Sequence, residues 1–271
     1  MSRRLKKVGL IFLDLCFAVY IIFAFSAFNK QEANTTVCKG VNIVISDATT
    51  HGFINNNEVK KRLENLNIYP KGKPLNLVSC RKIEEELLKT PFVKTAECYK
   101  DEGGTINVSI TQRLPVVRIK SINNDDYYID DKDCVMPNSD YTSDLIIATG
   151  FISRTYATRY VSALARKLME DDFCRNLFQQ INITHNLGVE LIPRIGNNVI
   201  YLGQLPVSNI KSERTKMINE FLDKKMSRLE AFYRYGLPIA GWNKYSDISL
   251  EFDNQIICKR IEEEETTEQI Q

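Results

Sequence analysis

Histidine is almost absent from this chain. Among its 271 residues only His51 and His185 are histidines, and neither belongs to a metal-binding spacing. The motifs of serine hydrolases (GxSxG), P-loop nucleotide-binding proteins and zinc proteases (HExxH) are also missing. Both histidines are therefore interpreted as solvated loop residues, and the sequence predicts no enzyme, no cofactor and no metal site.

An excess of charge of one sign is missing as well. The 36 basic and 34 acidic residues give a formal net charge of +2. Four of the basic residues and one acidic residue lie in residues 1–28, which leaves 32 against 33 in the remainder. Nucleic-acid binding needs a concentrated basic face, so this class of partner is excluded. Four consecutive glutamates and no apolar run mark residues 261–271 as a disordered acidic tail.

Cysteines are present, but without a recognisable motif. No CxxC pair and no Cys/His zinc spacing occurs. Cys98 and Cys258 lie in strand-like runs, where a small buried apolar residue is the commoner interpretation. Six cysteines follow the N-terminal segment and could form up to three disulfides, whose pairing the sequence does not reveal: Cys38, Cys80, Cys98, Cys134, Cys174 and Cys258.

The N-terminus carries the longest apolar run. Residues 8–28 hold a single charge, Asp14, and follow four basic residues. At helical rise these 21 residues span about 30 Å, the thickness of the hydrocarbon core of a bilayer. A cleaved signal peptide would have a shorter apolar core and a better cleavage site than Ser26-Ala27-Phe28. We therefore expect a cytoplasmic tail (1–7) and an uncleaved transmembrane helix (8–28), with the rest of the chain on the far side.

Two interpretations of Asp14 stay open. A carboxylate in lipid is costly and is usually paired or functional, so Asp14 could contact another membrane helix. It also lies within two turns of the basic flank, where it could extend toward the membrane surface. The sequence does not separate these roles.

After a polar linker (29–39), the pattern predicts a small sheet with both helices on one face. Apolar alternation and turn residues give the order β-α-α-β-β within about 75 residues. Asn55-Asn56-Asn57 and Ser79 are the expected helix N-caps. Val59, Leu63 and Leu66, and Ile83, Leu87 and Leu88, are the expected buried positions of the two helices. The elements are strand 41–45, helices to about 65 and 79–89, and strands 93–99 and 105–111.

This order, closed by TPFVKTAECYKDEGGTINVSITQRLPVVRI at 90–119, resembles a POTRA (polypeptide-transport-associated) domain, here residues 40–114. The Pro91-Phe92-Val93 turn, the INVSITQR strand and LPVVRI are similar to one POTRA family in particular, the bacterial cell-division proteins FtsQ/DivIB. The resemblance covers residues 1–260. It implies an α+β fold: one transmembrane helix, a POTRA domain and a mixed β-rich domain (115–260) with helices packed on its sheet.

The second half is consistent with that family. Strands at 127–130 and 134–137 flank an acidic turn, where the family usually has glycine and this chain has Asp133, which tolerates a left-handed backbone. A calcium site at this turn would need further oxygen ligands that are missing. The remaining expected elements are helices 154–178 and 209–235, strands 180–184, 188–194 and 199–203, and a final strand pair, 246–252 and 255–260.

The resemblance implies a non-enzymatic scaffold of the divisome in the cell inner membrane, enriched at the division septum. A terminal strand has unpaired N–H and C=O groups that accept a strand from another chain. In FtsQ-like proteins FtsB, in complex with FtsL, docks at this C-terminal edge. We therefore expect a proline at Ile257 to weaken FtsB capture. The implied partner-binding residues are Ser249, Glu251, Phe252, Gln255, Ile256, Ile257, Cys258, Lys259 and Arg260.

Some side-chain roles at this edge stay open. Phe252 occupies the position of a family aromatic, but a core position explains it equally well. Lys259 and Arg260 could pair with acidic residues of a partner or guard the edge against aggregation. Two other functions compete with the scaffold: a POTRA-containing envelope protein of transport or outer-membrane assembly, and a membrane-anchored cell-wall enzyme.

Overall fold

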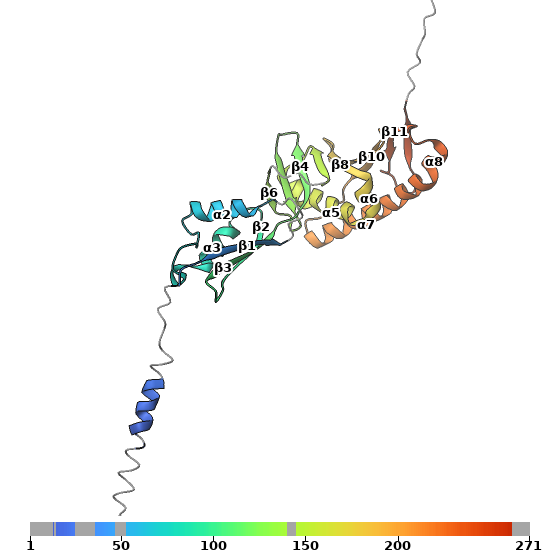
Figure 1. Ribbon diagram of the computed structural model, residues 1–271. Coiled ribbons are helices and arrows are strands. Elements are labelled where there is room, and N and C mark those ends of the chain that lie inside the picture. The colour runs from blue at the N-terminus through green and yellow to red at the C-terminus, as the bar shows by residue number, and fades with distance from the viewer. Residues whose placement is uncertain (1–12, 14, 25–35, 47–52, 140–144, 262–271) are drawn as a thin grey trace, which may run out of the picture. The chain divides into compact units, whose positions relative to one another are not determined.

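The computed structural model describes residues 13, 15–24, 36–46, 53–139 and 145–261 (Figure 1). They belong to two compact units. The first takes its described residues from Met1–Val44, Asn56–Glu86 and Ala96–Ser109, and the second from Ile45–Asn55, Leu87–Thr95 and Ile110–Gln271. The fold is mixed α+β with two sheets.

The predicted membrane segment lies only partly in the described residues. Residues 15–24 are helical, with the side chains of Phe17 and Phe23 64% and 76% exposed. None of the helices in the described part of the chain is both long and apolar enough to cross a bilayer. The predicted tail 1–7, Asp14, both ends of the predicted span 8–28 and residues 262–271 are outside the description.

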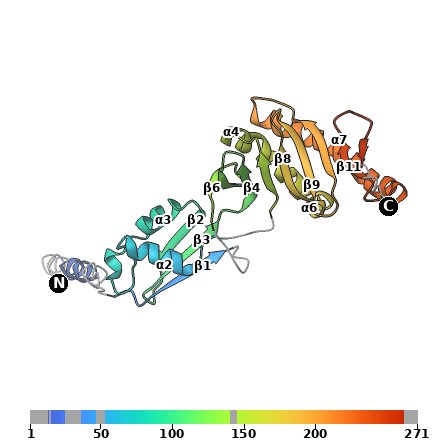
Figure 2. The same ribbon diagram turned by 90° about the horizontal axis from the view of Figure 1, so that it is seen from above.

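The predicted β-α-α-β-β order is found in a three-stranded sheet of order β1-β3-β2. Strand β3 alternates buried and half-buried residues, so one face of the sheet is covered. Helices α2 and α3 lie on the same side of it (Figure 2). The elements are β1 (Gly40–Ser46), α2 (Asn56–Asn65), η1 (Leu75–Leu77), α3 (Cys80–Leu88), β2 (Val93–Lys100) and β3 (Thr105–Gln112).

Local signals set the ends of these helices. The Ser79 hydroxyl accepts the Lys82 N–H at 3.2 Å, as predicted for an N-cap of α3. Leu66 and Leu88, however, are 43% and 45% exposed, so their predicted burial is wrong. Leu66 follows the end of α2, and Leu88 is the last residue of α3, where the helical spacing no longer determines which face is buried.

The second sheet has nine strands in the order β12-β11-β10-β9-β8-β7-β4-β5-β6. Strand pairs β4–β7, β7–β8 and β10–β11 are parallel, and the other five pairs are antiparallel. The strands are β4 (Pro115–Ser121), β5 (Asp126–Asp130), β6 (Val135–Pro137), β7 (Ile147–Gly150), β8 (Phe178–Ile183), β9 (Gly188–Pro193), β10 (Val199–Gln204), β11 (Tyr245–Ser249) and β12 (Ile257–Arg260).

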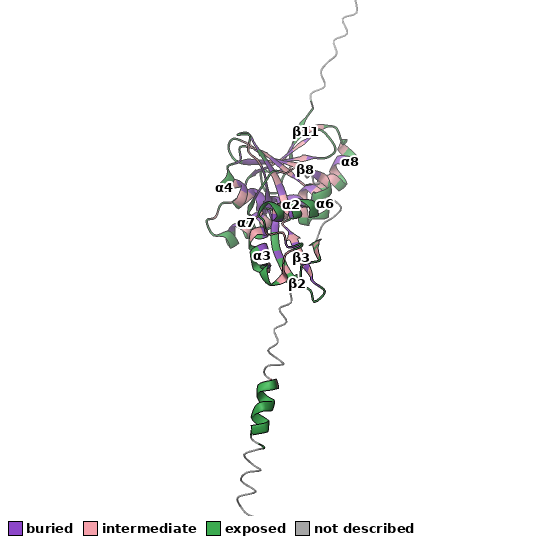
Figure 3. Cartoon of the chain, turned by 60° about the vertical axis from the view of Figure 1, so that its left-hand side comes forward, coloured by how far each residue is buried: buried purple, intermediate pink, exposed green. Residues whose placement is uncertain are grey.

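Helices packed on this sheet complete its core (Figure 3). Ile218, Leu222 and Leu229 of α7 are buried as predicted, while Phe221 and Phe232 are only partly buried. The helical elements are α4 (Arg154–Tyr156), the π-helical segment η2 (Ala157–Val161), α5 (Ser162–Glu170), α6 (Asp172–Leu177), α7 (Lys211–Ala231), the π-helical segment η3 (Phe232–Gly236) and α8 (Leu237–Ala240).

The prediction of one continuous helix at 154–178 is wrong. Asp171 adopts an extended backbone (φ −91°, ψ 125°) between α5 and α6. Its carboxylate accepts the Cys174 N–H at 2.8 Å and so caps α6. Aspartate competes with helical bonding by making such local hydrogen bonds, which explains the break.

The β5–β6 hairpin is confirmed, and it explains Asp133. Asp133 adopts the left-handed backbone that aspartate tolerates, with φ 65°. Its carboxylate lies 2.6 Å from the Arg166 guanidinium and 2.7 Å from the Lys211 ammonium. Burial alone would raise the pKa of Asp133, but hydrogen bonds from Lys211, Ser162 and Arg166 outweigh it and hold this pKa below its usual value. Aspartate thus adds ion pairs that glycine could not make.

We expect Asp133→Asn to destabilise the protein by about 1–3 kcal/mol at pH 7, because asparagine keeps the turn but loses two charge-assisted hydrogen bonds. A lowered folded-state pKa stabilises above the unfolded value of about 3.9, and this contribution disappears as the pH falls through the folded-state pKa. The difference between variant and wild type should therefore shrink progressively as the pH falls below the unfolded value and through the folded-state pKa. Urea unfolding across this range measures it; a constant difference would contradict the ion-pair explanation.

Candidate partner-binding edge

Strand β12 is the outermost strand at one end of the nine-stranded sheet. It pairs with β11 in antiparallel register, with Ile248 opposite Cys258 and Ser249 opposite Ile257. No strand in the described ranges pairs with its outer side. The predicted open edge at the end of the second domain is therefore present in the structure.

The hydrogen bonding of β12 identifies which main-chain groups face outward. The Ile261 N–H donates to the Lys244 carbonyl at 3.1 Å, so Ile261 faces β11. Main-chain groups alternate in direction along an antiparallel strand, so Lys259 and Ile257 also face β11. Cys258 and Arg260 then direct their N–H and C=O groups away from the sheet, where a further strand could pair with them.

The nine predicted partner-binding residues fall into two groups. Strand β11 ends at Ser249 and β12 begins at Ile257, so both predicted strands, 246–252 and 255–260, were too long. The side chain of Phe252 is 52% exposed, which rules out the core alternative for this residue. Ser249, Ile257, Cys258, Lys259 and Arg260 lie in strands, whereas Glu251, Phe252, Gln255 and Ile256 lie in the loop between them.

Two cations of α7 bind the loop that separates these two short strands. Lys225 Nζ donates to the carbonyls of Leu250 and Glu251 at 2.5 and 3.0 Å. Arg228 Nη1 donates to the carbonyls of Phe252 and Gln255 at 2.8 and 3.2 Å. These carbonyls are the acceptors that a longer β-ladder would need. Neither cation was predicted to contact this loop.

Lys225 is unusual for a lysine. It is 3% exposed, and its Nζ lies 4.7 Å from the centroid of the Phe221 ring. Burial lowers its pKa, and the neighbouring Arg228 lowers it further. A signal was present in the sequence: Lys225 continues the helical spacing of Ile218, Leu222 and Leu229, and therefore falls on the buried face of α7.

The side chains along β12 are amphipathic. Ile257 is 49% exposed, and Lys259 and Arg260 are exposed. Cys258 is half-buried against the core, and burial raises the pKa of its thiol. A thiol with a raised pKa is mostly protonated and a weak nucleophile. The edge thus presents backbone groups, an aliphatic side chain and two cations. These groups suit pairing with another strand better than they suit catalysis.

Two other edge strands have features that hinder pairing with a further strand. Strand β6, at the opposite end of the same sheet, has three residues and ends at Pro137, which has no N–H to donate. On β2, the Cys98 N–H is already taken by the Glu84 carboxylate of α3 at 2.7 Å.

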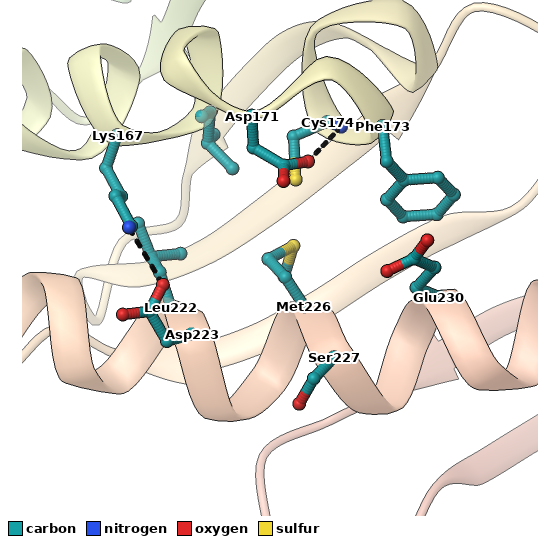
Figure 4. A pocket seen from close by; sticks show the side chains of 10 residues that line it. Lys167, Asp171, Phe173, Cys174, Leu222, Asp223, Met226, Ser227 and Glu230 are labelled. Atoms are coloured by element: carbon teal, nitrogen blue, oxygen red, sulfur yellow. Dashed lines mark hydrogen bonds and ion pairs between the residues drawn. The ribbon is translucent and has the colours of Figure 1, made fainter.

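A cavity of about 210 Å³ lies beside α6 and α7 (Figure 4). Lys167 reaches across it to the Asp223 carboxylate at 2.8 Å. Burial raises the pKa of Cys174, whose N–H donates to Asp171. The thiol is therefore protonated, and both Lys167 and Asp171 are engaged by neighbours. This arrangement does not supply an activated nucleophile.

Family models match two parts of the chain. Residues 36–111 match a POTRA-like domain. Residues 114–259, over half of the chain, match the family described as FtsQ/DivIB, C-terminal related. The second match includes all strands from β4 to β11 and ends one residue before the end of β12. A comparison with curated proteins found no match.

Proposed function

Because the chain belongs to the FtsQ/DivIB family, we propose that it is a membrane-anchored, non-enzymatic scaffold that binds other division proteins through the outer edge of β12. FtsQ/DivIB-like domains suggest a cell-division scaffold, and these families are not enzymes. Membership also implies a membrane protein of the division site with protein partners from the divisome.

The observation that carries the proposal is the direction of the main-chain groups of Cys258 and Arg260. Two outward N–H and two outward C=O groups on an edge strand form a template for β-augmentation. A stable contact of this kind would bury on the order of 1,000 Å² or more. That area exceeds what a four-residue strand provides, so the exposed loop residues Glu251, Phe252 and Gln255 would contribute to the contact.

We assign the bound strand to FtsB, in complex with FtsL, on the basis of the family resemblance. The contact would comprise the nine residues named above. Exposed Lys259 and Arg260 favour acidic side chains on the incoming segment, because unlike charges across an interface accelerate and orient association.

The anchor and the division into domains belong to the same proposal. Residues 8–28 would span the inner membrane, with residues 29–271 outside the cytoplasm. The POTRA domain (40–114) would follow the anchor in the sequence, and the β domain (115–260) would carry the docking edge. The anchor would take no part in docking at β12. Its role would be to hold the scaffold in the same compartment as its membrane-bound partners.

Site-specific photocrosslinking in growing cells tests the proposal. A photoreactive residue at Phe252, Ile257 or Lys259 should give adducts with FtsB. Val135, 40% exposed on the opposite edge strand β6, is the matched control and should give none. Equal adducts from Val135, or none from the β12 positions in a protein that reaches midcell, would refute docking at this edge.

A further inference from the structure

The loop between β11 and β12 is fixed from one side by a single helix. Lys225 and Arg228, three residues apart on α7, donate five hydrogen bonds to four loop carbonyls, those of Leu250, Glu251, Phe252 and Gln255. No ion pair in the described part of the chain includes Lys225. The groups in contact with the buried ammonium are therefore loop carbonyls, while the Asp253 and Glu251 carboxylates attract it without forming an ion pair and raise its pKa against the effect of burial.

Such an arrangement is costly for stability alone. Burying an ammonium group without a carboxylate in direct contact is unfavourable, and an apolar side chain of similar volume often serves a core as well or better. Lys225 nevertheless lies among Ile218, Leu222 and Leu229 on the buried side of α7. This placement is explained if its function is to hold the loop rather than to fill the core.

The position of the loop in turn determines the edge. Strand β12 has four residues, and its ladder in the described chain is made with β11 alone. A strand this short loses order readily if the turn before it is free. Asn254, in this turn, has a left-handed backbone with φ 62°. The carbonyls held by α7 lie on both sides of Asn254, at Phe252 and Gln255.

We propose that Lys225 and Arg228 are positioning residues for the docking edge: they preform β12, so that an extended acidic partner segment meets an ordered strand. This inference rests on the proposed function. Preorganisation raises affinity by reducing the conformational entropy that binding would otherwise cost. Because both cations bind backbone carbonyls, the role does not depend on the loop side chains.

The test compares buried cations on one helix. Lys225→Met keeps the aliphatic volume and removes the ammonium. Arg214→Met is the matched control: Arg214 is 6% exposed on α7 and donates to the carbonyls of Arg159 and Ser208 at 3.1 and 2.9 Å, away from the loop. Arg228→Met and Arg228→Lys form a second, half-buried pair in case Lys225→Met does not fold.

Hydrogen exchange of the full-length protein is the first measurement. In Lys225→Met we expect the Ile257 and Lys259 amides, which face β11, to exchange at least about tenfold faster, while the β8 and β9 amides keep their protection. Arg214→Met should leave the β12 amides unchanged. Arg228→Met should accelerate them, and Arg228→Lys should restore part of the protection.

Crosslinking from Ile257 in cells is the second measurement. We expect its yield to fall at least about fivefold in Lys225→Met and to stay unchanged in Arg214→Met. Unchanged exchange at β12, or faster exchange with an unchanged yield, would overturn the positioning role. If the wild type gave no adducts although its β12 amides were protected, the proposed function would fail instead, so the two failures can be told apart.

Discussion

Replacement of Cys258 by proline is expected to reduce FtsB capture at least about tenfold while the protein stays folded. Proline removes an outward N–H and places its ring where the partner backbone would lie, and the loss of one ladder bond with this steric block exceeds about 1.4 kcal/mol. An edge strand tolerates proline at a position whose N–H faces solvent. Co-purification of FtsB with the full-length protein measures the effect.

Two further variants make this result interpretable. Cys258→Ala loses the half-buried thiol but keeps the N–H, and should bind FtsB nearly as well as the wild type. Ile257→Pro, which the sequence analysis singled out, removes an N–H that faces β11, so its loss of capture would report damage to the β11–β12 ladder. Capture by Cys258→Pro equal to that of Cys258→Ala would argue against strand addition at β12.

Substitution of Gly150 by valine is expected to cost more stability than any other single change considered. Gly150, at the end of β7, has φ 97°, and a Cβ there would lie 2.2 Å from the Ile183 carbonyl oxygen and 2.7 Å from Asn182 Oδ1. The Ile183 carbonyl oxygen already accepts a hydrogen bond from the Phe151 N–H at 2.9 Å. Relief would require β7 to separate from β8, at a cost above about 4 kcal/mol.

Gly196 provides the matched control. It has φ 98°, but a Cβ there would meet nothing closer than Asn198 Oδ1 at 3.8 Å. Gly196→Val should therefore show only the cost of the left-handed backbone, about 1–2 kcal/mol. Urea unfolding of both variants measures the difference, and equal losses would show that the sheet relaxes around Gly150 without penalty.

The sequence predicted well the features that neighbouring residues determine. The Ser79 cap and the β5–β6 hairpin depend on side chains within a few positions of each other. The open outer edge of β12 was also predicted from the sequence. The final strand pair and the family resemblance both indicated the last strand of the second domain as the exposed edge.

Features that depend on distant contacts were not accessible. The parallel pairing of β10 with β11 joins residues on either side of α7, and no local pattern encodes it. The loop between β11 and β12 is bound by Lys225 and Arg228, more than 20 residues earlier in the chain. Aspartate is a good N-cap, so Asp171 could have indicated the start of a second helix. The apolar residues on either side of it continue the helical spacing, however, and this pattern favoured one unbroken helix.

The order of the nine-stranded sheet has a consequence for biogenesis. From β7 onward each strand is added beside its predecessor, so the sheet grows outward in the direction of translation, from β7 to β12. During synthesis every intermediate therefore ends in a different edge strand, and the edge lined by Cys258 and Arg260 forms last. If β12 is the docking edge, as proposed, a nascent chain becomes able to bind its partner only after the preceding strands of this sheet have been made and assembled.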